Sequence, residues 1–339
     1  MKPAKAGGKP LVSILIFTYN HAPYIKKALD SVLGQEGSFT AEIIIHDDAS
    51  SDGTAEIIEE YYERYPDMIV PVLQKENQKQ KGVNYISLFV HPLVRGKYVA
   101  YCEGDDYWTD PRKLAIQLHI LQSHPEYSGV SHNCIVVDEF GRRLKPVNKF
   151  YPFRKNFVYT LKELSYESRM PGQTASVVIR SRIVYDTPEA EREAFKGLRA
   201  CLGDRKRTLI MLLNGPVLCL KRPMSAYRYV TEGGSSWNAQ THGKNLAGRY
   251  FVEEYDFRAF SKTFYGIRLR NQYVLFGTGL MAAFRVWRHP SEENEAQYQY
   301  VLDAVGGKKE LLRFLIKCFP GAVLTVPPKI IQEIVWRFF

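Results

Sequence analysis

The sequence predicts an α/β protein with a mainly parallel sheet, flanking helices and a helical C-terminal region. The first 140 residues alternate short β-rich runs with helical patterns, which is typical of a parallel sheet covered by helices. Two acidic clusters directly follow predicted strands of this half. From Gly243 onward helical periodicity dominates, so we expect the last hundred residues to be helical.

The first two strand and helix pairs are the clearest elements. Residues 12–17 form an uninterrupted apolar run that reads as a buried strand, and residues 42–46 form a second strand. Pro23 suits the first turn of a helix over 23–33, because a backbone N–H in the first turn has no partner within the helix and its absence in proline costs no hydrogen bond. Residues 54–65 have the spacing of a second amphipathic helix.

The remaining elements are predicted in chain order. We expect a strand at 69–73, an exposed polar loop at 74–82, a helix at 83–94, a strand at 97–102 and a helix from Pro111 to about Pro125. Farther on we expect a strand at 175–180, helices at 188–200 and 205–213, and a strand near 217–220.

Composition and charge restrict the class of protein. With 45% hydrophobic and 24% charged residues the chain is globular, and its net charge of +10 favours anionic partners. The five cysteines are dispersed and form no C-x-x-C pair, which argues against a disulfide framework or a zinc knuckle and favours a reducing cytoplasm. No stretch approaches the roughly 18 apolar residues of a membrane span, so we expect any membrane contact to be peripheral.

The segment from Glu103 through Gly104 to Asp105 and Asp106 places three carboxylates in four residues at a predicted strand end. Such an arrangement is repulsive unless a cation compensates it. Mg²⁺ and Mn²⁺ prefer oxygen ligands and commonly bind through one or two carboxylates together with substrate phosphates. The alternative is a solvated acidic turn.

Asp47 and Asp48 end the second predicted strand and open a run of turn-forming residues. One interpretation is an Asx-type turn that caps the helix beginning near Thr54. The other is a carboxylate that accepts a hydrogen bond from a nucleotide base or ribose. Ligands of open α/β sheets collect at the carboxyl ends of strands, so both acidic clusters could meet at one sheet edge.

Three ordered motifs, at residues 12–20, 47–54 and 103–108, together resemble the family 2 glycosyltransferases of the GT-A fold. The resemblance covers roughly residues 10–240. It implies an inverting, metal-dependent hexosyltransferase-type enzyme that moves a sugar from a nucleotide-diphosphate sugar, with UDP favoured, to an acceptor hydroxyl. Bacterial enzymes of this kind build surface polysaccharide or lipopolysaccharide.

The resemblance also implies site residues. Thr18, Tyr19, Asn20 and Asp48 match the nucleotide-binding positions, and Glu103 and Asp105 match further donor-binding positions. Asp106 is the expected ligand of the divalent cation, Mn²⁺ or Mg²⁺. Glu103 replaces the leading aspartate of the D-x-D-type motif.

Two later segments also resemble the family, but each differs from its pattern at one position. Asp204 corresponds to the catalytic base, although Arg205 stands where relatives often have tryptophan. Val230 stands where a histidine ligand is expected, which leaves the third metal ligand open, and His242 is too speculative a substitute. Arg228 either contacts the diphosphate or belongs to a packed strand, and Trp237 is a candidate acceptor contact.

The resemblance and the helical pattern together suggest a domain plan. We expect a flexible N-terminus at 1–10, a glycosyltransferase domain at 11–240 with a nucleotide half at 11–140 and an acceptor half at 141–240, and a helical extension at 241–339. The extension carries a basic, apolar segment at 308–339. That segment either contacts a membrane, which would suit a lipid-linked acceptor, or packs on the enzyme or in a homodimer.

Partners and alternatives complete the prediction. We expect a nucleotide-sugar donor, a glycan or lipid-linked acceptor, no nucleic acid, and a cytoplasmic location with the inner face of the cytoplasmic membrane as an option. The net charge and the 22 tyrosines leave a nucleic-acid-binding protein as an alternative, but no such motif occurs and the acidic clusters would repel phosphate. A sugar nucleotidyltransferase, which would release pyrophosphate, is a further alternative.

Overall fold

The computed structural model describes residues 1–4, 7–145, 152–166, 170–185, 203–231 and 236–325. The chain divides into two compact units. The first lies within residues 1–160, 171–187 and 210–242, and the second lies within 161–170, 188–209 and 243–339. The functional division into donor, acceptor and C-terminal parts stays a prediction.

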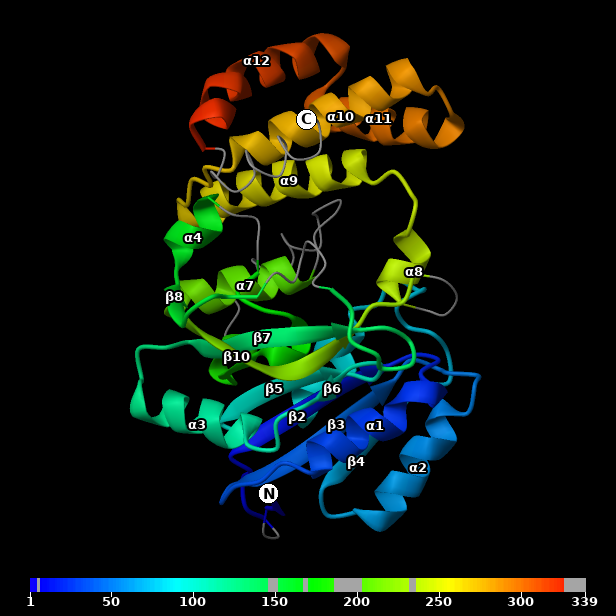
Figure 1. Cartoon of the computed structure of the whole chain (residues 1–339), viewed down its shortest axis with the longest axis vertical. Coiled ribbons are helices and arrows are strands. Elements are labelled where there is room, and N and C mark those ends of the chain that lie inside the picture. Colours follow the sequence, from blue (N-terminus) through cyan, green and yellow to red (C-terminus); the bar gives the residue numbers. More distant parts are fainter. Residues whose placement is uncertain (5–6, 146–151, 167–169, 186–202, 232–235, 326–339) are drawn as a thin grey trace. The chain divides into compact units, whose positions relative to one another are not determined.

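A mixed sheet forms the centre of the first unit (Figure 1). Its strands follow the order β1-β3-β2-β5-β9-β7-β10-β6, with β4 also paired to β3 and β8 paired to β10. Their bounds are β1 Lys2–Pro3, β2 Val12–Thr18, β3 Thr40–Asp47, β4 Ile69–Leu73, β5 Tyr98–Glu103, β6 Tyr107–Trp108, β7 Gly129–Val137, β8 Phe157–Tyr159, β9 Val178–Arg180 and β10 Val217–Arg228.

Most pairings in this sheet are parallel, as predicted. The strands β1 to β5 pair in parallel with one another, and β10 is parallel to β7. The strand β9 is antiparallel to both β5 and β7, while β6 and β8 are antiparallel to β10. The strand β2 is buried along almost its whole length, because both faces of a parallel sheet are covered.

Helices pack around this sheet. The helix α1 packs against β6 and α2, α2 packs against β4, and α3 packs against β7 and β9. Pro23 lies in the first turn of α1, as the sequence predicts. The bounds are α1 Ala22–Leu33, α2 Thr54–Arg64, α3 Lys113–Ser123, α5 Arg182–Tyr185, α7 Gly203–Leu213 and α8 Trp237–Thr241.

Several predicted elements differ from the structure. The helix expected at 83–94 is shorter and irregular: a π-helical turn at Ile86–Val90 leads into a 3₁₀ turn at His91–Leu93, where Pro92 lacks the N–H of a regular α-helical bond. The strand expected at 175–180 is reduced to β9, because a 3₁₀ turn occupies Thr174–Ser176. The helix expected at 188–200 falls outside the described residues.

The described part of the second unit is mainly helical, which confirms the prediction for residues 243–325. Its main helices surround a separate apolar core that includes Phe251, Leu275 and Val301. Gly266 and Gly306 end two of these helices with φ of 68° and 93°, a conformation that favours glycine at a helix C-terminus. The bounds are α4 Leu161–Tyr166, α9 Ala247–Tyr265, α10 Gln272–Arg288, α11 Glu292–Val305 and α12 Lys308–Thr325.

A membrane-spanning segment was not expected from the sequence. Among the described residues, no helix is both long enough and apolar enough to cross a bilayer. Of the cysteines that the structure describes, Cys102, Cys134, Cys219 and Cys318 form no disulfide.

Candidate active site

Three neighbouring parallel strands bring the predicted donor-site residues to one edge of the sheet. The strands β3, β2 and β5 lie side by side and end at Asp47, Thr18 and Glu103. The amide N of Asp48 donates to the carbonyl of Thr18 at 3.1 Å, and the amide N of Gly104 donates to the carbonyl of Phe17 at 2.8 Å. Both acidic loops are therefore attached to the end of β2.

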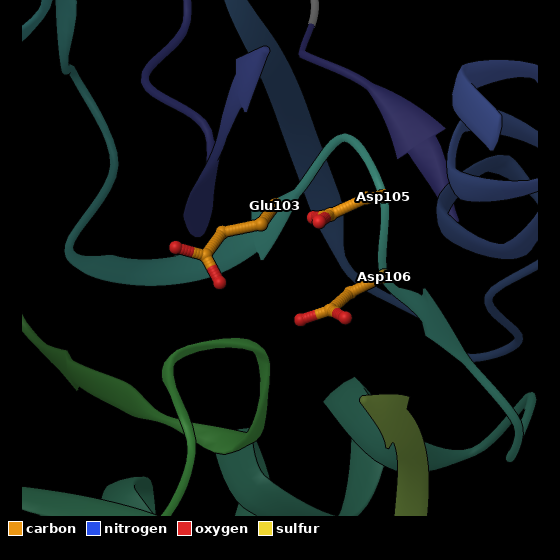
Figure 2. Close-up of side chains that lie close together, drawn as sticks. All are labelled: Glu103, Asp105 and Asp106. Carbon is orange, nitrogen blue, oxygen red and sulfur yellow. The ribbon is translucent and has the colours of Figure 1, made fainter. Parts of the chain in front are cut away.

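The acidic cluster consists of Glu103, Asp105 and Asp106, whose carboxylates converge on a common space (Figure 2). One carboxylate oxygen from each lies within 4.8 Å of the others. Asp106 is only 1% exposed, whereas Glu103 and Asp105 are partly exposed. Burial, followed by the charges of Asp105 and Glu103, raises the pKa of Asp106 well above its usual range.

This set of donors fits a hard divalent cation. All three side chains offer carboxylate oxygen, which Mg²⁺ and Mn²⁺ prefer, and their mutual repulsion is relieved by a positive charge among them. Within the described part of the chain, no other group of three or more acidic, histidine or cysteine side chains converges in this way.

Two residues hold Asp106 in place: Gln173, which sequence reasoning did not select, and Arg228, which it selected for another role. The Oδ1 of Asp106 accepts the backbone N–H of Arg228 at 2.8 Å, and its Oδ2 accepts the side-chain amide of Gln173. The other end of the Gln173 amide accepts the N–H of Ala175 at 2.9 Å, which fixes its orientation. The sequence signal for Gln173 is weak, namely one polar side chain before an apolar run.

Arg228 fastens the acidic loop from a second direction. Its Nε donates to the carbonyl of Asp105 at 2.9 Å, and its Nη1 donates to the carbonyls of Asp138 and Glu139 at 2.8 and 2.7 Å. The guanidinium also lies 4.3 Å from the ring centre of Tyr24. Arg228 is 4% exposed and ends β10, so the packed-strand alternative is confirmed.

Gly104 allows the acidic loop to approach β2 closely. A Cβ at this position would lie 2.8 Å from both the Cβ and the Oγ1 of Thr18, and 2.9 Å from the Nδ1 of His21. Side-chain atoms do not approach one another that closely, so the turn between Glu103 and Asp105 requires a glycine. The Nε2 of His21 lies 3.9 Å from an oxygen of Asp105.

The segments after β2 and β3 each contain a residue with an unusual backbone conformation. Asn20 and Ala49 have φ of 54° and 62°, in the left-handed region that non-glycine residues rarely occupy. The N–H of Asn20 donates to the Oγ of Ser50 at 2.8 Å, and the N–H of Ser51 donates to the Oδ1 of Asn20 at 2.9 Å. These bonds stabilise two strained residues beside the predicted donor-binding positions.

Most carboxylates of the loop after β3 have local structural roles. Asp47 accepts the N–H of Ser50 at 2.9 Å, so it stabilises a local turn but does not cap α2 as the turn interpretation expected. Asp52 accepts the N–H of Ala22 at 2.9 Å and the N–H of Thr54 at 3.1 Å. It therefore binds amides in the first turns of both α1 and α2, where a negative charge is favourable.

Asp48 joins this loop to the polar segment at 74–82. It is 4% exposed, and its two oxygens accept the backbone N–H groups of Gln78 at 2.7 Å and Lys79 at 3.1 Å. Burial, then the charges of Asp48 and Glu103, raise the pKa of Tyr85 to about 12. Tyr85 thus lies close to both acidic loops, and its ring stacks on His46 with the ring centres 4.5 Å apart.

Asp204 lies in the second unit at the start of α7. Its Oδ1 accepts from the Nη2 of Arg207 at 2.7 Å, and its side chain is 37% exposed. The neighbouring Arg205 is buried and pairs with Glu254 at 2.7 Å and Glu253 at 3.6 Å. Arg205, the departure from the family pattern, thus forms a buried ion pair with α9, and the catalytic role of Asp204 stays a prediction.

The segment after β10 supplies no further ligand to the acidic cluster from its described residues. Val230 lies at its start, and its carbonyl accepts from the Oγ of Ser236 at 3.4 Å. His242 is exposed and is not part of the acidic group, and residues 232–235 fall outside the described part. The third protein ligand therefore stays undetermined.

Comparison with known proteins identifies the family. The family model described as Glycosyl transferase family 2 matches residues 13–183, half of the chain. An uncharacterised protein of Mycobacterium tuberculosis is 39% identical over 178 residues, 52% of this chain and 48% of that protein. The putative glycosyltransferase EpsE of Bacillus subtilis is 34% identical over 134 residues, 40% of this chain and 46% of that protein. The chain thus spans about half the length of the curated relatives it matches.

A solved structure supports the same conclusion for the fold. Residues 1–349 of S. aureus TarS, in complex with UDP-GlcNAc, align with a TM-score of 0.61 at 14% identity, over 93% of this chain and 88% of that one. This likeness confirms the predicted GT-A fold. Together with the family match over residues 13–183, it establishes that the chain belongs to the family 2 glycosyltransferases.

Proposed function

We propose that this protein is a metal-dependent, inverting glycosyltransferase that transfers a sugar from a UDP-sugar to an acceptor hydroxyl. One observation carries the proposal most directly: three carboxylates converge within 4.8 Å at the end of β5 in a chain of this family. The TarS structure of the same fold was solved with UDP-GlcNAc, which favours a UDP-sugar as donor.

The donor would bind along the edge formed by the ends of β3, β2 and β5. In the proposal, Thr18, Tyr19, Asn20 and Asp48 contact the nucleoside, with Asp48 accepting a hydrogen bond from the base. A carboxylate has about four lone-pair directions, so the two amide donors at Gln78 and Lys79 leave acceptor capacity on Asp48. These amides also fix the orientation of the carboxylate.

Glu103, Asp105 and Asp106 would hold Mn²⁺ or Mg²⁺, with Asp106 as the expected ligand. When bound, the cation would neutralise negative charge on the diphosphate leaving group. Glu103 and Asp105 are more exposed than Asp106, and they add the carboxylates that face the donor in this proposal. Gln173 and Arg228 each donate to one oxygen of Asp106 and so fix the orientation of its carboxylate.

Asp204 is the proposed base. An acceptor hydroxyl is a weak nucleophile at neutral pH, and a nearby carboxylate can take its proton as the new bond forms at the anomeric carbon. The bond from that carbon to the diphosphate breaks on the opposite face, and the electron pair leaves with the nucleoside diphosphate. Inversion of configuration follows, and no covalent enzyme intermediate is needed.

The acceptor class is proposed from the relatives. The putative teichuronic acid biosynthesis glycosyltransferase TuaG of Bacillus subtilis is 33% identical over 138 residues, 39% of this chain and 52% of that protein. We therefore propose an acceptor that is a glycan or a lipid-linked glycan, in the synthesis of a cell-surface polysaccharide.

Calorimetric titration with UDP in the presence and absence of Mn²⁺ tests the proposal, together with hydrolysis of a panel of nucleotide sugars. We expect Mn²⁺-dependent binding, release of UDP in preference to pyrophosphate, and loss of at least about a hundredfold in turnover for Asp105→Asn and Asp106→Asn. Asp67→Asn, at an exposed acid in the turn before β4, is the matched control. Metal-independent turnover that survives both active-site substitutions would contradict the proposal.

Asp204→Asn separates binding from transfer. We expect it to leave the affinity for UDP within about twofold and to reduce transfer to an acceptor by about a thousandfold, because only the proton acceptor is lost. Arg207→Gln, which removes the partner of Asp204 but keeps the carboxylate, should retain most of the transfer. Undiminished transfer by Asp204→Asn would exclude this residue as the base.

A further inference from the structure

The helices α10 and α12 carry large apolar side chains that the described structure leaves exposed. On α10 these are Leu280, Phe284 and Trp287, with exposed fractions of 50%, 51% and 75%. On α12 they are Leu312, Ile316 and Phe319, with 61%, 64% and 54%. Each set follows the i, i+4, i+7 spacing that places side chains along one side of a helix.

The two sets form one surface, because α10 and α12 pack in antiparallel order (Figure 1). The rings of Phe276 and Phe319 lie 5.5 Å apart, and a Cβ at Gly279 would lie 3.2 Å from Leu315. Gly321 meets Gln272 at the other end of the pair. The exposed stripes therefore run beside each other, and we call these six side chains the apolar face.

Basic side chains flank the apolar face. The helices α10 and α12 together carry one acid, Glu310, which pairs with Arg313 at 2.6 Å. The same two helices carry six basic residues, and all six are exposed: Arg285, Arg288, Lys308, Lys309, Arg313 and Lys317. The helix α11 packs on both α10 and α12 and carries four acids, namely Glu292, Glu293 and Glu295 in its first turn and the exposed Asp303 near its end.

We infer that the apolar face binds the surface of an anionic lipid membrane. A helix pair with aromatic and aliphatic side chains on one side and basic residues beside them can insert the apolar groups at the headgroup boundary, while the basic groups contact anionic headgroups. Trp287 suits this position, because its ring combines a large apolar surface with one polar N–H. The inference goes beyond the proposed reaction and does not depend on it.

The charges near the apolar face favour a membrane over two other occupants, namely a second copy of the chain and the chain's own segment 326–339. A symmetric dimer through this face would bring together two copies of α10 and α12, which carry six basic residues and one acid, so the net positive charges would repel each other. The chain's own segment 326–339 carries Lys329 and Arg337 against a single acid, Glu333, so it cannot neutralise the flanking residues either. An anionic lipid surface complements them.

Vesicle co-sedimentation of the full chain tests the inference. The probes are vesicles of phosphatidylcholine alone and vesicles of phosphatidylcholine with phosphatidylglycerol. We expect binding only to the second kind and weaker binding in high salt, since exposed charges are screened. The variant Arg285→Gln/Lys309→Gln/Lys317→Gln should bind about a hundredfold more weakly, because each basic residue contributes a factor of about five near the surface.

A second variant and two controls separate the apolar contribution from folding. Phe284→Ser/Trp287→Ser/Ile316→Ser should lose at least about tenfold in vesicle affinity, since these side chains would no longer enter the interface. The control Lys2→Gln/Lys9→Gln/Lys155→Gln removes three exposed charges of the first unit, and Phe140→Ser removes a ring that is 73% exposed there. Both controls should bind vesicles like the original chain, and all variants should keep UDP binding.

The outcomes are decisive in both directions. Loss of vesicle binding in both face variants, with UDP binding kept, supports the inference even if sugar transfer is never detected. Vesicle binding that is absent in the full chain, or that both face variants retain, overturns it. A dimer that the apolar variant converts to a monomer without any vesicle binding, or binding that appears only after residues 326–339 are removed, overturns it as well.

Discussion

The loop after β3 and the loop after β5 are both rich in aspartate, yet their carboxylates have different surroundings. In the first loop Asp47, Asp48 and Asp52 accept backbone N–H groups from their own turn or from neighbouring segments. In the second loop Glu103, Asp105 and Asp106 converge on each other. The number of acids is similar, but only the second loop concentrates negative charge.

The difference shows where this fold accepts unfavourable charge. Around the second loop, Asp106 is buried beside two other acids. Below it the buried amine of Lys113 lies 4.1 Å from the ring centre of Trp108 and has no hydrogen-bond partner among the described residues. Natural folds depart from local energetic rules mainly at functional sites. The second loop is therefore the place where a ligand would supply the missing stabilisation.

Of the variants compared here, Gly104→Ala should have the largest effect. It should displace the second loop and so remove the convergence of its acids that distinguishes it from the first loop. The new Cβ would collide with Thr18 and His21, so the acids must shift relative to β2. We expect about a hundredfold loss of Mn²⁺-dependent donor turnover and a loss of about 1–3 kcal/mol in the free energy of unfolding. Kinetics and urea denaturation would measure both.

Gly277→Ala is the control for that substitution, because a Cβ at this position of α10 meets nothing within 4 Å. It should keep turnover unchanged and raise helix stability slightly. Equal turnover in the two alanine variants would mean that the close packing of Gly104 on β2 is unimportant for the reaction.

Lys113→Met should stabilise the protein at neutral pH. Burial lowers the pKa of Lys113 to about 7 from 10.5, although the ring of Trp108 favours the charged amine. A lowered pKa of a basic group means that the unfolded chain binds the proton more strongly, so the original chain gains stability as the pH rises from about 7 to 10.5.

We therefore expect Lys113→Met to raise the free energy of unfolding by about 2 kcal/mol or more at pH 7, since each pKa unit corresponds to about 1.4 kcal/mol. The gain should shrink as the pH is raised through 9. Urea denaturation at several pH values measures it, and a gain that does not depend on pH would show that the amine is not the cause.

Asp52→Ala in the first loop and Asp105→Asn in the second loop should change the free energy of unfolding in opposite directions. The first variant removes the acceptor for amides of Ala22 and Thr54, which should cost about 1–2 kcal/mol in the free energy of unfolding. The second relieves repulsion within the acidic cluster, which should add a few tenths of a kcal/mol in metal-free buffer. Thermal denaturation in a chelating buffer compares them, and destabilisation by both would remove the distinction between the loops.

The contribution of Asp52 to the free energy of unfolding should also depend on pH. Burial opposes ionisation of Asp52, but hydrogen bonds from Thr54 and Ala22 outweigh it and lower the pKa of this carboxyl. Its contribution to stability is therefore present above the pKa of an unfolded aspartate and is lost as the pH falls through the lowered value. The difference in stability between the original chain and Asp52→Ala should accordingly decrease in acid.

Much of the first unit could be predicted from local pattern. The strands at 12–17, 42–46, 69–73 and 97–102 lie within a residue or two of β2, β3, β4 and β5, because buried parallel strands are short apolar runs. The strand β7 was missed, since Ser131, His132 and Asn133 interrupt its apolar pattern although they are buried. Their environment depends on neighbours far away in the chain.

The candidate site likewise contains features that the local sequence shows and contacts that only the fold creates. The acidic motif could be found from the sequence because its three carboxylates fall within four residues, and the structure brings them together as a group. The contacts of Gln173 and Arg228 with Asp106 could not be predicted, although Arg228 was a candidate for another role, because they arise only through the order of β5, β9, β7 and β10 in the sheet. The assignments of individual donor-binding, metal and catalytic residues remain predictions.

The bond between Arg228 and Asp106 joins residues 122 positions apart and has a consequence for synthesis of the chain. A ribosome-bound chain that has emerged only to residue 183, the end of the family match, still lacks β10 and with it both contacts from Arg228 to the acidic loop. The portion matched by the family model therefore lacks the residue that fastens this loop. We expect the proposed cation site to form late in synthesis, only after residue 228 has left the exit tunnel and docked against β7.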